Sequence, residues 1–153
     1  MTLSRRNFLT NSTAAVCGTL LAGGLESCSI GHLLYSSGDI PVIEGEPILA
    51  LSTESSLQQI GGAVKKRYRA INDGDVILIV RISEKEFAAF AAQCTHWGAE
   101  VNNPVDGVLV CPFHGSRYKA TDGSVLEGPA KKPLPKFGVD FDESKQQLRI
   151  KEA

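Results

Sequence analysis

Cys94-Thr95-His96-Trp97-Gly98 and Cys111-Pro112-Phe113-His114-Gly115-Ser116 are two short stretches that each pair one thiol with one imidazole. A thiolate is a soft metal ligand and an imidazole is a borderline one, so each stretch offers both kinds of ligand. This alternation favours a centre with two chemically different metal atoms, one held by the two sulfurs and the other by the two nitrogens. It predicts that both stretches form loops that reach the same centre.

A mononuclear zinc site and a catalytic Cys–His pair are the two alternatives for these residues. Zinc sites usually group their cysteines in one turn and their histidines in another, unlike the order found here. A catalytic pair would use one stretch and leave the other without a role. The flanking residues favour loops shaped to bind a metal centre. Gly98 and Gly115 permit tight turns, and Pro112 fixes the chain between Cys111 and His114.

The two stretches resemble the two cluster-binding boxes of Rieske iron–sulfur proteins, and the resemblance extends over about residues 48–151. It implies one [2Fe–2S] cluster per chain, held by the mixed thiolate and imidazole ligation that is typical of this class. It also implies that Cys94 and Cys111 bind one iron, that His96 and His114 bind the other, and that the histidines lie at an exposed tip.

The resemblance implies roles for four further residues beside the cluster. Ser116 and Tyr118 occupy positions whose hydroxyls, in the high-potential branch of the family, donate hydrogen bonds to the cluster and to a ligand sulfur. Such donors favour the reduced, more negative form and raise the reduction potential. Trp97 is expected either to shield one side of the cluster or simply to pack. Pro129 belongs to residues 128–134, which resemble the proline loop that covers the cluster.

Two departures from the family pattern bear on function. Respiratory Rieske proteins of the quinol–cytochrome complexes carry an extra cysteine in each box, joined as a disulfide, and here those positions hold Ala99 and Phe113. The stretch between His96 and Cys111 is also short for the family. Both departures argue against a standard quinol-oxidising complex, and neither affects the implied ligands.

Residues 1–27 have the pattern of a twin-arginine export signal or a membrane anchor. Ser4-Arg5-Arg6-Asn7-Phe8-Leu9 precedes a moderately apolar run that carries no charge before Glu26. Glycines interrupt this run, which makes it weak as a spanning helix of about 20 apolar residues. Leu25-Glu26-Ser27-Cys28 resembles a lipoprotein processing site. We therefore expect the protein at the periplasmic or outer face of the bacterial cytoplasmic membrane, held by an uncleaved signal or by a lipidated Cys28.

The rest of the chain divides into a linker at residues 28–47, rich in turn-forming residues, and a Rieske domain at residues 48–153. The cluster-binding part of this domain is expected at about residues 93–136. The predicted fold class is all-β, an antiparallel β-sandwich or small barrels of the Rieske type with a cluster-binding subdomain of two loops. Strands are predicted at residues 76–82, 87–92, 108–110, 137–141 and 147–150.

The leading function is that of an exported, membrane-associated one-electron carrier, as a subunit of a respiratory quinol oxidoreductase or of another oxidoreductase complex. Its donor would be a quinol or a redox protein, and its acceptor a protein. Two alternatives stay open: a soluble Rieske ferredoxin that feeds an oxygenase, and a zinc-stabilised binding module without redox activity. The chain is expected to be an electron-transfer protein or subunit rather than a complete enzyme. Its net charge of −1 gives no reason to expect nucleic acid as a partner.

Overall fold

The structure is a computed structural model that describes residues 40–152. The predicted signal or anchor at residues 1–27 and residues 28–39 of the predicted linker lie outside the described residues. Among the described residues, the structure contains no helix with the length and apolar character needed to cross a membrane.

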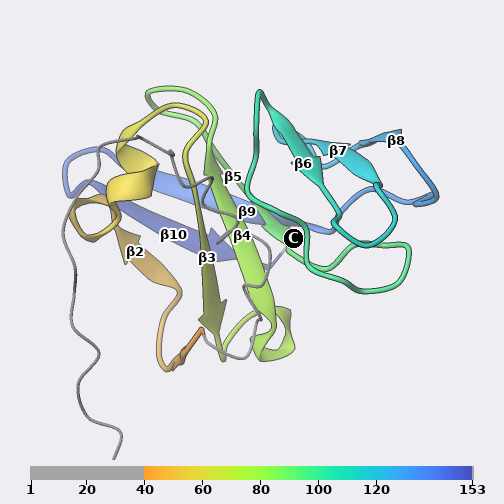
Figure 1. The fold of residues 1–153 in the computed structure, drawn as a ribbon. Helices are drawn as coiled ribbons and strands as arrows, with labels where there is room; N and C mark the ends of the chain where they lie inside the picture. Colours follow the sequence, from red (N-terminus) through yellow and green to blue (C-terminus); the bar gives the residue numbers. More distant parts are fainter. Residues whose placement is uncertain (1–39, 153) are drawn as a thin grey trace, which may run out of the picture. The chain divides into compact units, whose positions relative to one another are not determined.

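A sheet of seven strands forms the larger part of the domain (Figure 1). The strand order is β1-β3-β4-β5-β9-β10-β2, and neighbouring strands are antiparallel except for β1 and β3. The strands are β1 (Val42–Ile43), β2 (Ile48–Ala50), β3 (Ala63–Tyr68), β4 (Val76–Arg81), β5 (Phe87–Ala91), β9 (Lys136–Asp142) and β10 (Gln147–Lys151). The 3₁₀ segments are η2 (Leu51–Thr53), η3 (Ser55–Gln58) and η4 (Asn72–Gly74).

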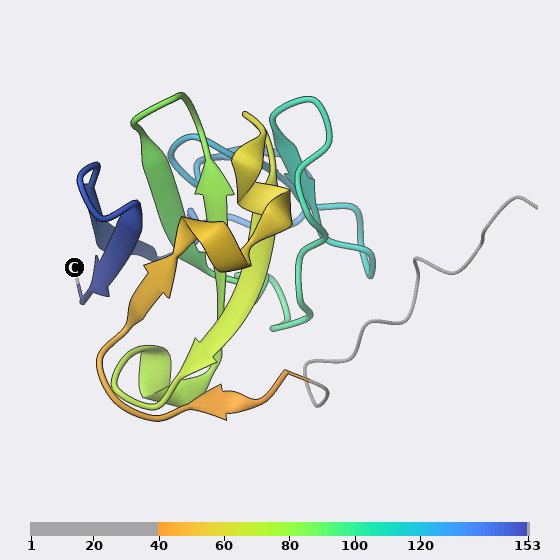
Figure 2. The same cartoon turned by 90° about the vertical axis from the view of Figure 1, so that its left-hand side faces the viewer.

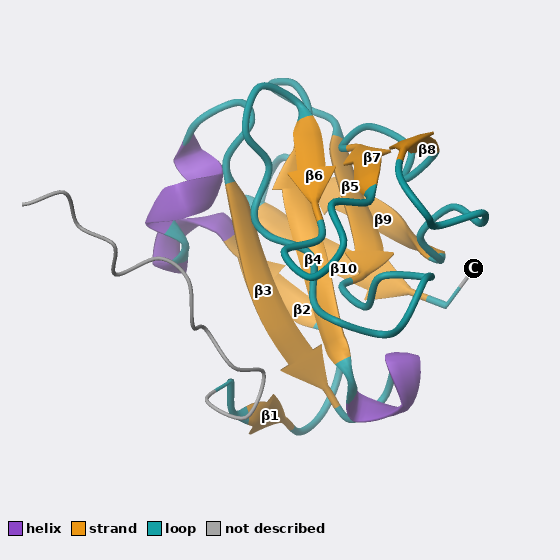
Figure 3. Ribbon diagram, turned by 45° about the vertical axis from the view of Figure 1, so that its right-hand side comes forward, coloured by secondary structure: helices purple, strands orange, loops and turns teal. Residues whose placement is uncertain are grey.

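A second sheet of three short antiparallel strands stands beside β4 and β5 (Figures 1 and 3). Its strands are β6 (Val108–Val110), β7 (Arg117–Lys119) and β8 (Val125–Glu127), in that order. The hairpin that joins β6 to β7 contains the second of the two Cys–His stretches. The small sheet therefore carries the second of the two predicted loops.

Strand β4 separates two hydrophobic cores, which explains its nearly continuous apolar sequence. Val76, Leu78 and Val80 point into a core shared with the small sheet, while Ile77 and Ile79 point into a core enclosed by the large sheet. Side chains alternate between the two faces of a strand, so a strand that is covered on both faces must be apolar throughout. Each such side chain contributes about 1.5–3 kcal/mol to the free energy of folding when it is fully buried. Strand β5 alternates between the same two cores.

The core enclosed by the large sheet is covered by the segment that contains η2 and η3, shown in yellow in Figure 2. Leu51 and Leu57 from this segment are buried against Leu148 and Ile150 of β10. The large sheet thus curls around its own core, and the small sheet packs on the outside of β4 and β5.

The predicted all-β fold class is confirmed, and each of the five predicted strands is present. The structure also places β1 within the predicted linker at residues 28–47. Val42 and Ile43 pair with β3, and Ile40 is buried in the core shared with the small sheet. Apolar side chains at these positions join the sheet even though glycine and proline surround them in the sequence.

Candidate metal centre

Three loops meet where the two sheets adjoin. The first loop, residues 94–98, follows β5; the second loop, residues 111–116, joins β6 to β7; the proline loop, residues 128–134, connects β8 to β9 (Figure 3). Each loop therefore begins at or near the end of a strand, as the sequence predicts for the first two. Such anchoring gives a ligand set a rigid base.

The first and second loops are closed by the same pair of backbone hydrogen bonds. The Cys94 amide donates to the Ala99 carbonyl over 2.8 Å, and the Gly98 amide donates to the Cys94 carbonyl over 2.8 Å. In the second loop, the Cys111 amide donates to the Ser116 carbonyl and the Gly115 amide donates to the Cys111 carbonyl. Gly98 and Gly115 have φ angles of +77° and +71°, which glycine adopts without strain.

The two thiols are buried side by side and do not form a disulfide. Cys94 is 3% exposed and Cys111 is 2% exposed, and the two thiols are close enough for each to affect the pKa of the other. Burial disfavours ionisation of Cys94, but hydrogen bonds from the Tyr118 hydroxyl and the His96 backbone outweigh it and lower the pKa of Cys94. Burial raises the pKa of Cys111, and the adjacent Cys94 sulfur adds to that effect. A cationic metal at this point would stabilise both as thiolates.

The two imidazoles lie together on the exposed side of the site. The ring centroids of His96 and His114 are 5.0 Å apart, and the rings meet edge to face. The Nδ1 atom of His96 is buried and has no hydrogen-bond partner, and His114 is exposed. A buried ring nitrogen without a partner is costly unless it binds a metal or another ligand. The donor set of two sulfurs and two imidazoles therefore fits a [2Fe–2S] cluster with mixed ligation.

Tyr118 joins the first loop to the small sheet. Its hydroxyl lies 3.1 Å from the Cys94 sulfur and accepts a hydrogen bond from the Thr95 amide over 3.1 Å. The Thr95 hydroxyl donates its proton to the Lys132 carbonyl over 2.7 Å, so it has none left for Tyr118. The Thr95 oxygen, 3.1 Å from the Tyr118 oxygen, can therefore only accept from Tyr118. Tyr118 carries a single proton, and an ionised Cys94 sulfur is the preferred acceptor for it because a charged acceptor forms the stronger hydrogen bond.

The proline loop packs directly on the second loop. Ser116 is fully buried, and its hydroxyl accepts a hydrogen bond from the Ala130 amide over 3.1 Å. Gly128 approaches so closely that a Cβ atom there would lie 2.6 Å from the Ser116 Cα atom. Pro129, predicted to contact the cofactor, is exposed within this loop. The loop is therefore held against the site mainly through its backbone and through Ala130.

Two exposed aromatic side chains flank the histidines. Trp97 is 78% exposed; its ring stacks on His96 at 5.5 Å and meets the edge of His114 at 5.5 Å. Phe113 is 70% exposed and lies 6.3 Å from the His114 ring. Trp97 thus contacts both predicted nitrogen ligands and does not pack into either core.

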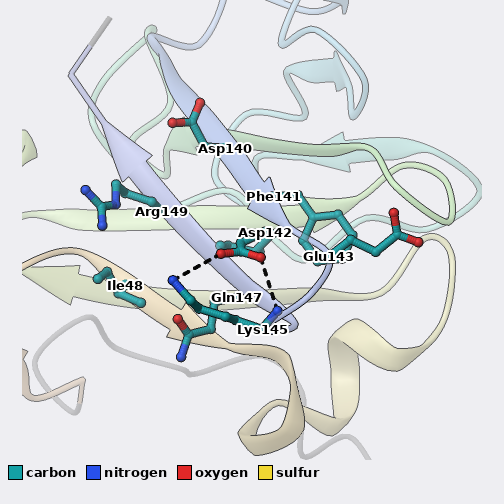
Figure 4. A pocket seen from close by; sticks show the side chains of 9 residues that line it. Ile48, Asp140, Phe141, Asp142, Glu143, Lys145, Gln147 and Arg149 are labelled. Carbon is teal, nitrogen blue, oxygen red and sulfur yellow. Dashed lines mark hydrogen bonds and ion pairs between the residues drawn. The ribbon is translucent and has the colours of Figure 1, made fainter.

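A hollow on β2, β9 and β10 is lined by acidic side chains that already have partners (Figure 4). Its carboxylates are engaged: Asp142 accepts a hydrogen bond from the Lys145 amide, Asp140 pairs with Lys151, and Glu143 pairs with Lys85. Across residues 40–152, no three His, Cys, Asp or Glu side chains gather around one metal ion. A binuclear cluster takes two protein ligands on each metal and requires no such group.

Residues 53–138, more than half of the sequence, match the profile of the Rieske [2Fe-2S] domain. The chain belongs to the Rieske family. Its cofactor is a [2Fe–2S] cluster, and the chain is a Rieske electron carrier. This family membership favours the cluster over the zinc site and the catalytic Cys–His pair that the residues alone left open.

The chain is similar to the iron-sulfur subunits of two cytochrome b6-f complexes. It is 31% identical over 145 residues to cytochrome b6-f complex iron-sulfur subunit 3 of Nostoc sp. PCC 7120, covering 86% of this chain and 76% of that protein. It is 38% identical over 95 residues to the cytochrome b6-f complex iron-sulfur subunit of Gloeobacter violaceus, covering 59% of this chain and 41% of that protein. The chain spans only 24% of another curated relative.

A crystal structure shows the same fold. The cyanobacterial plasma membrane Rieske protein PetC3 from Synechocystis PCC 6803 matches with a TM-score of 0.50 and 28% sequence identity. The match covers 58% of this chain and 85% of that chain.

Sequence reasoning missed the contacts of two residues that hold the Rieske site together. Thr95 lies inside the first stretch and links Tyr118 to the proline loop. A threonine at this position in the sequence does not by itself indicate either contact. Gly128 stands in the sequence as one residue of the proline loop. A glycine beside a proline suggests a turn, and only the fold shows that it must be small to approach Ser116.

The contact between Gly128 and the second loop predicts a specific effect of Gly128→Ala. The new Cβ atom would meet the Ser116 backbone, and the φ angle of +99° would be strained. Gly45→Ala is a matched control, because Gly45 has a φ angle of +98° and open space around it. We expect both variants to lose about 1–2 kcal/mol through backbone strain. Only Gly128→Ala should also lose iron during purification, as measured by metal analysis and thermal unfolding. Equal iron contents in both variants would contradict this assignment.

Proposed function

We propose that this chain is an exported, membrane-associated one-electron carrier whose cluster is bound by Cys94 and Cys111 through sulfur and by His96 and His114 through nitrogen. The observation that carries the ligand assignment is the separation of donors within one site. The sulfurs are buried together, and the imidazoles lie together on the exposed side, one of them with a buried nitrogen that has no partner.

When bound, the [2Fe–2S] cluster supplies a centre that gains and loses one electron at a time. Side chains around the site stabilise the negative charge that the cluster gains on reduction. Tyr118 directs a hydroxyl at the Cys94 sulfur, and Ser116 is buried beside the same thiols. Hydrogen bonds to sulfur become stronger as negative charge is added, so both hydroxyls favour the reduced form. The exposed His114 and the half-buried His96 let a partner approach the metal centre without displacing the covering loops.

The location and the complex are inferred from the N-terminal sequence and from the relatives. The twin-arginine pattern at residues 1–27 suits a protein that folds around its cofactor before export, which would keep Cys94 and Cys111 from pairing in an oxidising compartment. Relatives of this chain are named as cytochrome b6-f subunits and as a plasma membrane protein. We place the domain on the outer face of the cytoplasmic membrane, as a subunit that passes electrons from a quinol or redox protein to an acceptor protein.

One observation favours a soluble Rieske ferredoxin that feeds an oxygenase. Ala99 and Phe113 stand where a disulfide would brace the loops of respiratory members, so the loops of this chain have no such covalent link. The hydroxyls of Ser116 and Tyr118 favour the carrier of higher potential instead. A measured potential far on the negative side would support the ferredoxin.

The ligand assignment predicts that Cys111→Ser abolishes the cluster. The unchanged protein should contain about two iron atoms and two acid-labile sulfides per chain and give the electron paramagnetic resonance spectrum of a mixed-ligand cluster. Cys28→Ser is the matched control, because Cys28 lies outside the Rieske domain, and it should keep the full signal. Zinc in place of iron, or an unchanged spectrum in Cys111→Ser, would refute the assignment.

The hydrogen bond from Tyr118 predicts a lower reduction potential in Tyr118→Phe. A bond worth about 1 kcal/mol more to the reduced state corresponds to a decrease of about 40 mV in a one-electron couple. Tyr68→Phe is the control, since Tyr68 is equally buried but its hydroxyl has no partner and lies in the other core. Redox titration of both variants measures the difference. A potential that is unchanged by Tyr118→Phe would leave the hydroxyl without a tuning role.

The export proposal predicts that Arg5→Lys/Arg6→Lys keeps the protein in the cytoplasm. Twin-arginine export depends on the arginine pair, so cell fractionation should find the folded, iron-containing protein inside the cell. Arg149→Lys, on the exposed part of β10, controls for the loss of arginine itself and should leave the distribution unchanged. Normal export of the double variant would contradict the assignment of residues 1–27 as a twin-arginine signal.

A further inference from the structure

We infer that the exposed tip of this domain docks a redox protein whose own docking face is acidic. The tip consists of the first loop, the second loop and the proline loop. This inference rests on the proposed function, because it assumes that the electron leaves or enters beside His96 and His114. It adds the chemistry of the partner, which the proposed function leaves open.

The centre of the tip is aromatic and exposed. Among the described residues, Trp97 and Phe113 are the exposed aromatic side chains, and every other phenylalanine and tyrosine is buried or half-buried. Both surround His114, at ring distances of 5.5 Å and 6.3 Å. Trp and Phe are enriched at the centre of protein interfaces, where they bury a large area at a small cost in conformational entropy. Exposed aromatic groups gathered at one point mark an interaction site.

The rim of the tip is positively charged. The three loops contain Lys131 and Lys132 and no aspartate or glutamate, although the whole chain has a net charge of −1. Both lysines are exposed, and neither takes part in an ion pair with another described residue. The Lys132 carbonyl accepts a hydrogen bond from Thr95, which holds this pair of cations beside the first loop. Two unpaired cations beside an apolar centre complement an acidic face.

A protein partner explains both parts of the tip. A quinol could contact the aromatic centre, but a small neutral molecule has no use for exposed lysines on the rim. An anionic membrane could attract the lysines and accept the aromatic rings, but it would cover His96 and His114 without accepting an electron. An acidic redox protein uses the lysines for encounter and the rings for the contact through which the electron passes.

Cytochrome c provides a matched pair of acceptors for the test. Native cytochrome c is rich in lysine, and succinylation of the same protein replaces those cations with carboxylates. In each reaction, reduced holoprotein loses one electron and the oxidised haem gains it. We expect the succinylated form to react faster at low salt and to slow as ionic strength rises, because attraction between opposite charges is screened.

The decisive variant is Lys131→Glu/Lys132→Glu in the full-length holoprotein. It should slow the reaction with succinylated cytochrome c by about tenfold or more at low salt and remove most of its salt dependence. Its electron paramagnetic resonance spectrum should match that of the unchanged protein, since neither lysine side chain forms a hydrogen bond or ion pair with a described residue. Its potential is measured as well, so that the rates are compared at equal driving force.

Lys85→Glu/Lys145→Glu is the control with the same change in net charge. Lys85 precedes β5 and pairs with Glu143, while the first loop follows β5, so the two positions lie at opposite ends of that strand. The five residues of β5, at about 3.3 Å each, lie between them. Lys145 lies in the turn between β9 and β10, which also contains Glu143, the ion-pair partner of Lys85 (Figure 4). This variant should change the rate by less than about threefold, because distant exposed charges are screened.

A binding measurement gives a second readout without electron transfer. Nuclear magnetic resonance titration of succinylated zinc-substituted cytochrome c with oxidised holoprotein should show shifts around the porphyrin edge that Lys131→Glu/Lys132→Glu weakens. Equal rates for the tip variant and the distal control would overturn the inference, as would stronger binding to vesicles with anionic lipid than to the acidic cytochrome. A protein without the [2Fe–2S] signal would instead refute the proposed function.

Discussion

Everything at this site depends on keeping two thiols buried side by side without letting them oxidise or separate. Cys94 comes from a loop on the large sheet and Cys111 from a hairpin of the small sheet, so the pair lies in the core that the two sheets share. Burial alone would oppose the ionisation that metal binding requires. The backbone amides of the closed loops and the Tyr118 hydroxyl supply the compensating hydrogen bonds, chiefly to Cys94.

Non-covalent contacts connect the loops of this chain. Tyr118 bonds to Cys94 and Thr95, Thr95 bonds to the proline loop, and Gly128 lies against Ser116. Each bond contributes about 0.5–1.5 kcal/mol, and a network of bonds that share partners holds geometry better than isolated ones. The second loop, the first loop and the proline loop therefore form one unit, in which a change at one position is expected to reach the others.

The site has two chemically different ends, and the fold sets their directions. The sulfur end faces the core between the sheets, where apolar side chains such as Leu109 and Phe90 exclude water. The imidazole end faces outward among Trp97 and Phe113. Added charge is stabilised from the buried side by hydroxyls, while access for a partner is left to the exposed side. This arrangement suits an electron carrier whose imidazole end is open to a partner.

The sequence alone determined the donor types, the fold class and the family resemblance, because Cys and His at short spacings are rare and chemically specific. It also predicted β4 and β5, because each contains a run of apolar residues that is long enough to recognise as a strand. It did not reveal β7, since Arg117–Lys119 is short and polar, with a single buried tyrosine. Only the tertiary structure decided that Cys-x-His and Cys-x-x-His close into equivalent loops, that Thr95 links Tyr118 to the proline loop, and that Gly128 must be small. These properties depend on contacts between segments far apart in the chain, and no local pattern of residues encodes such distances.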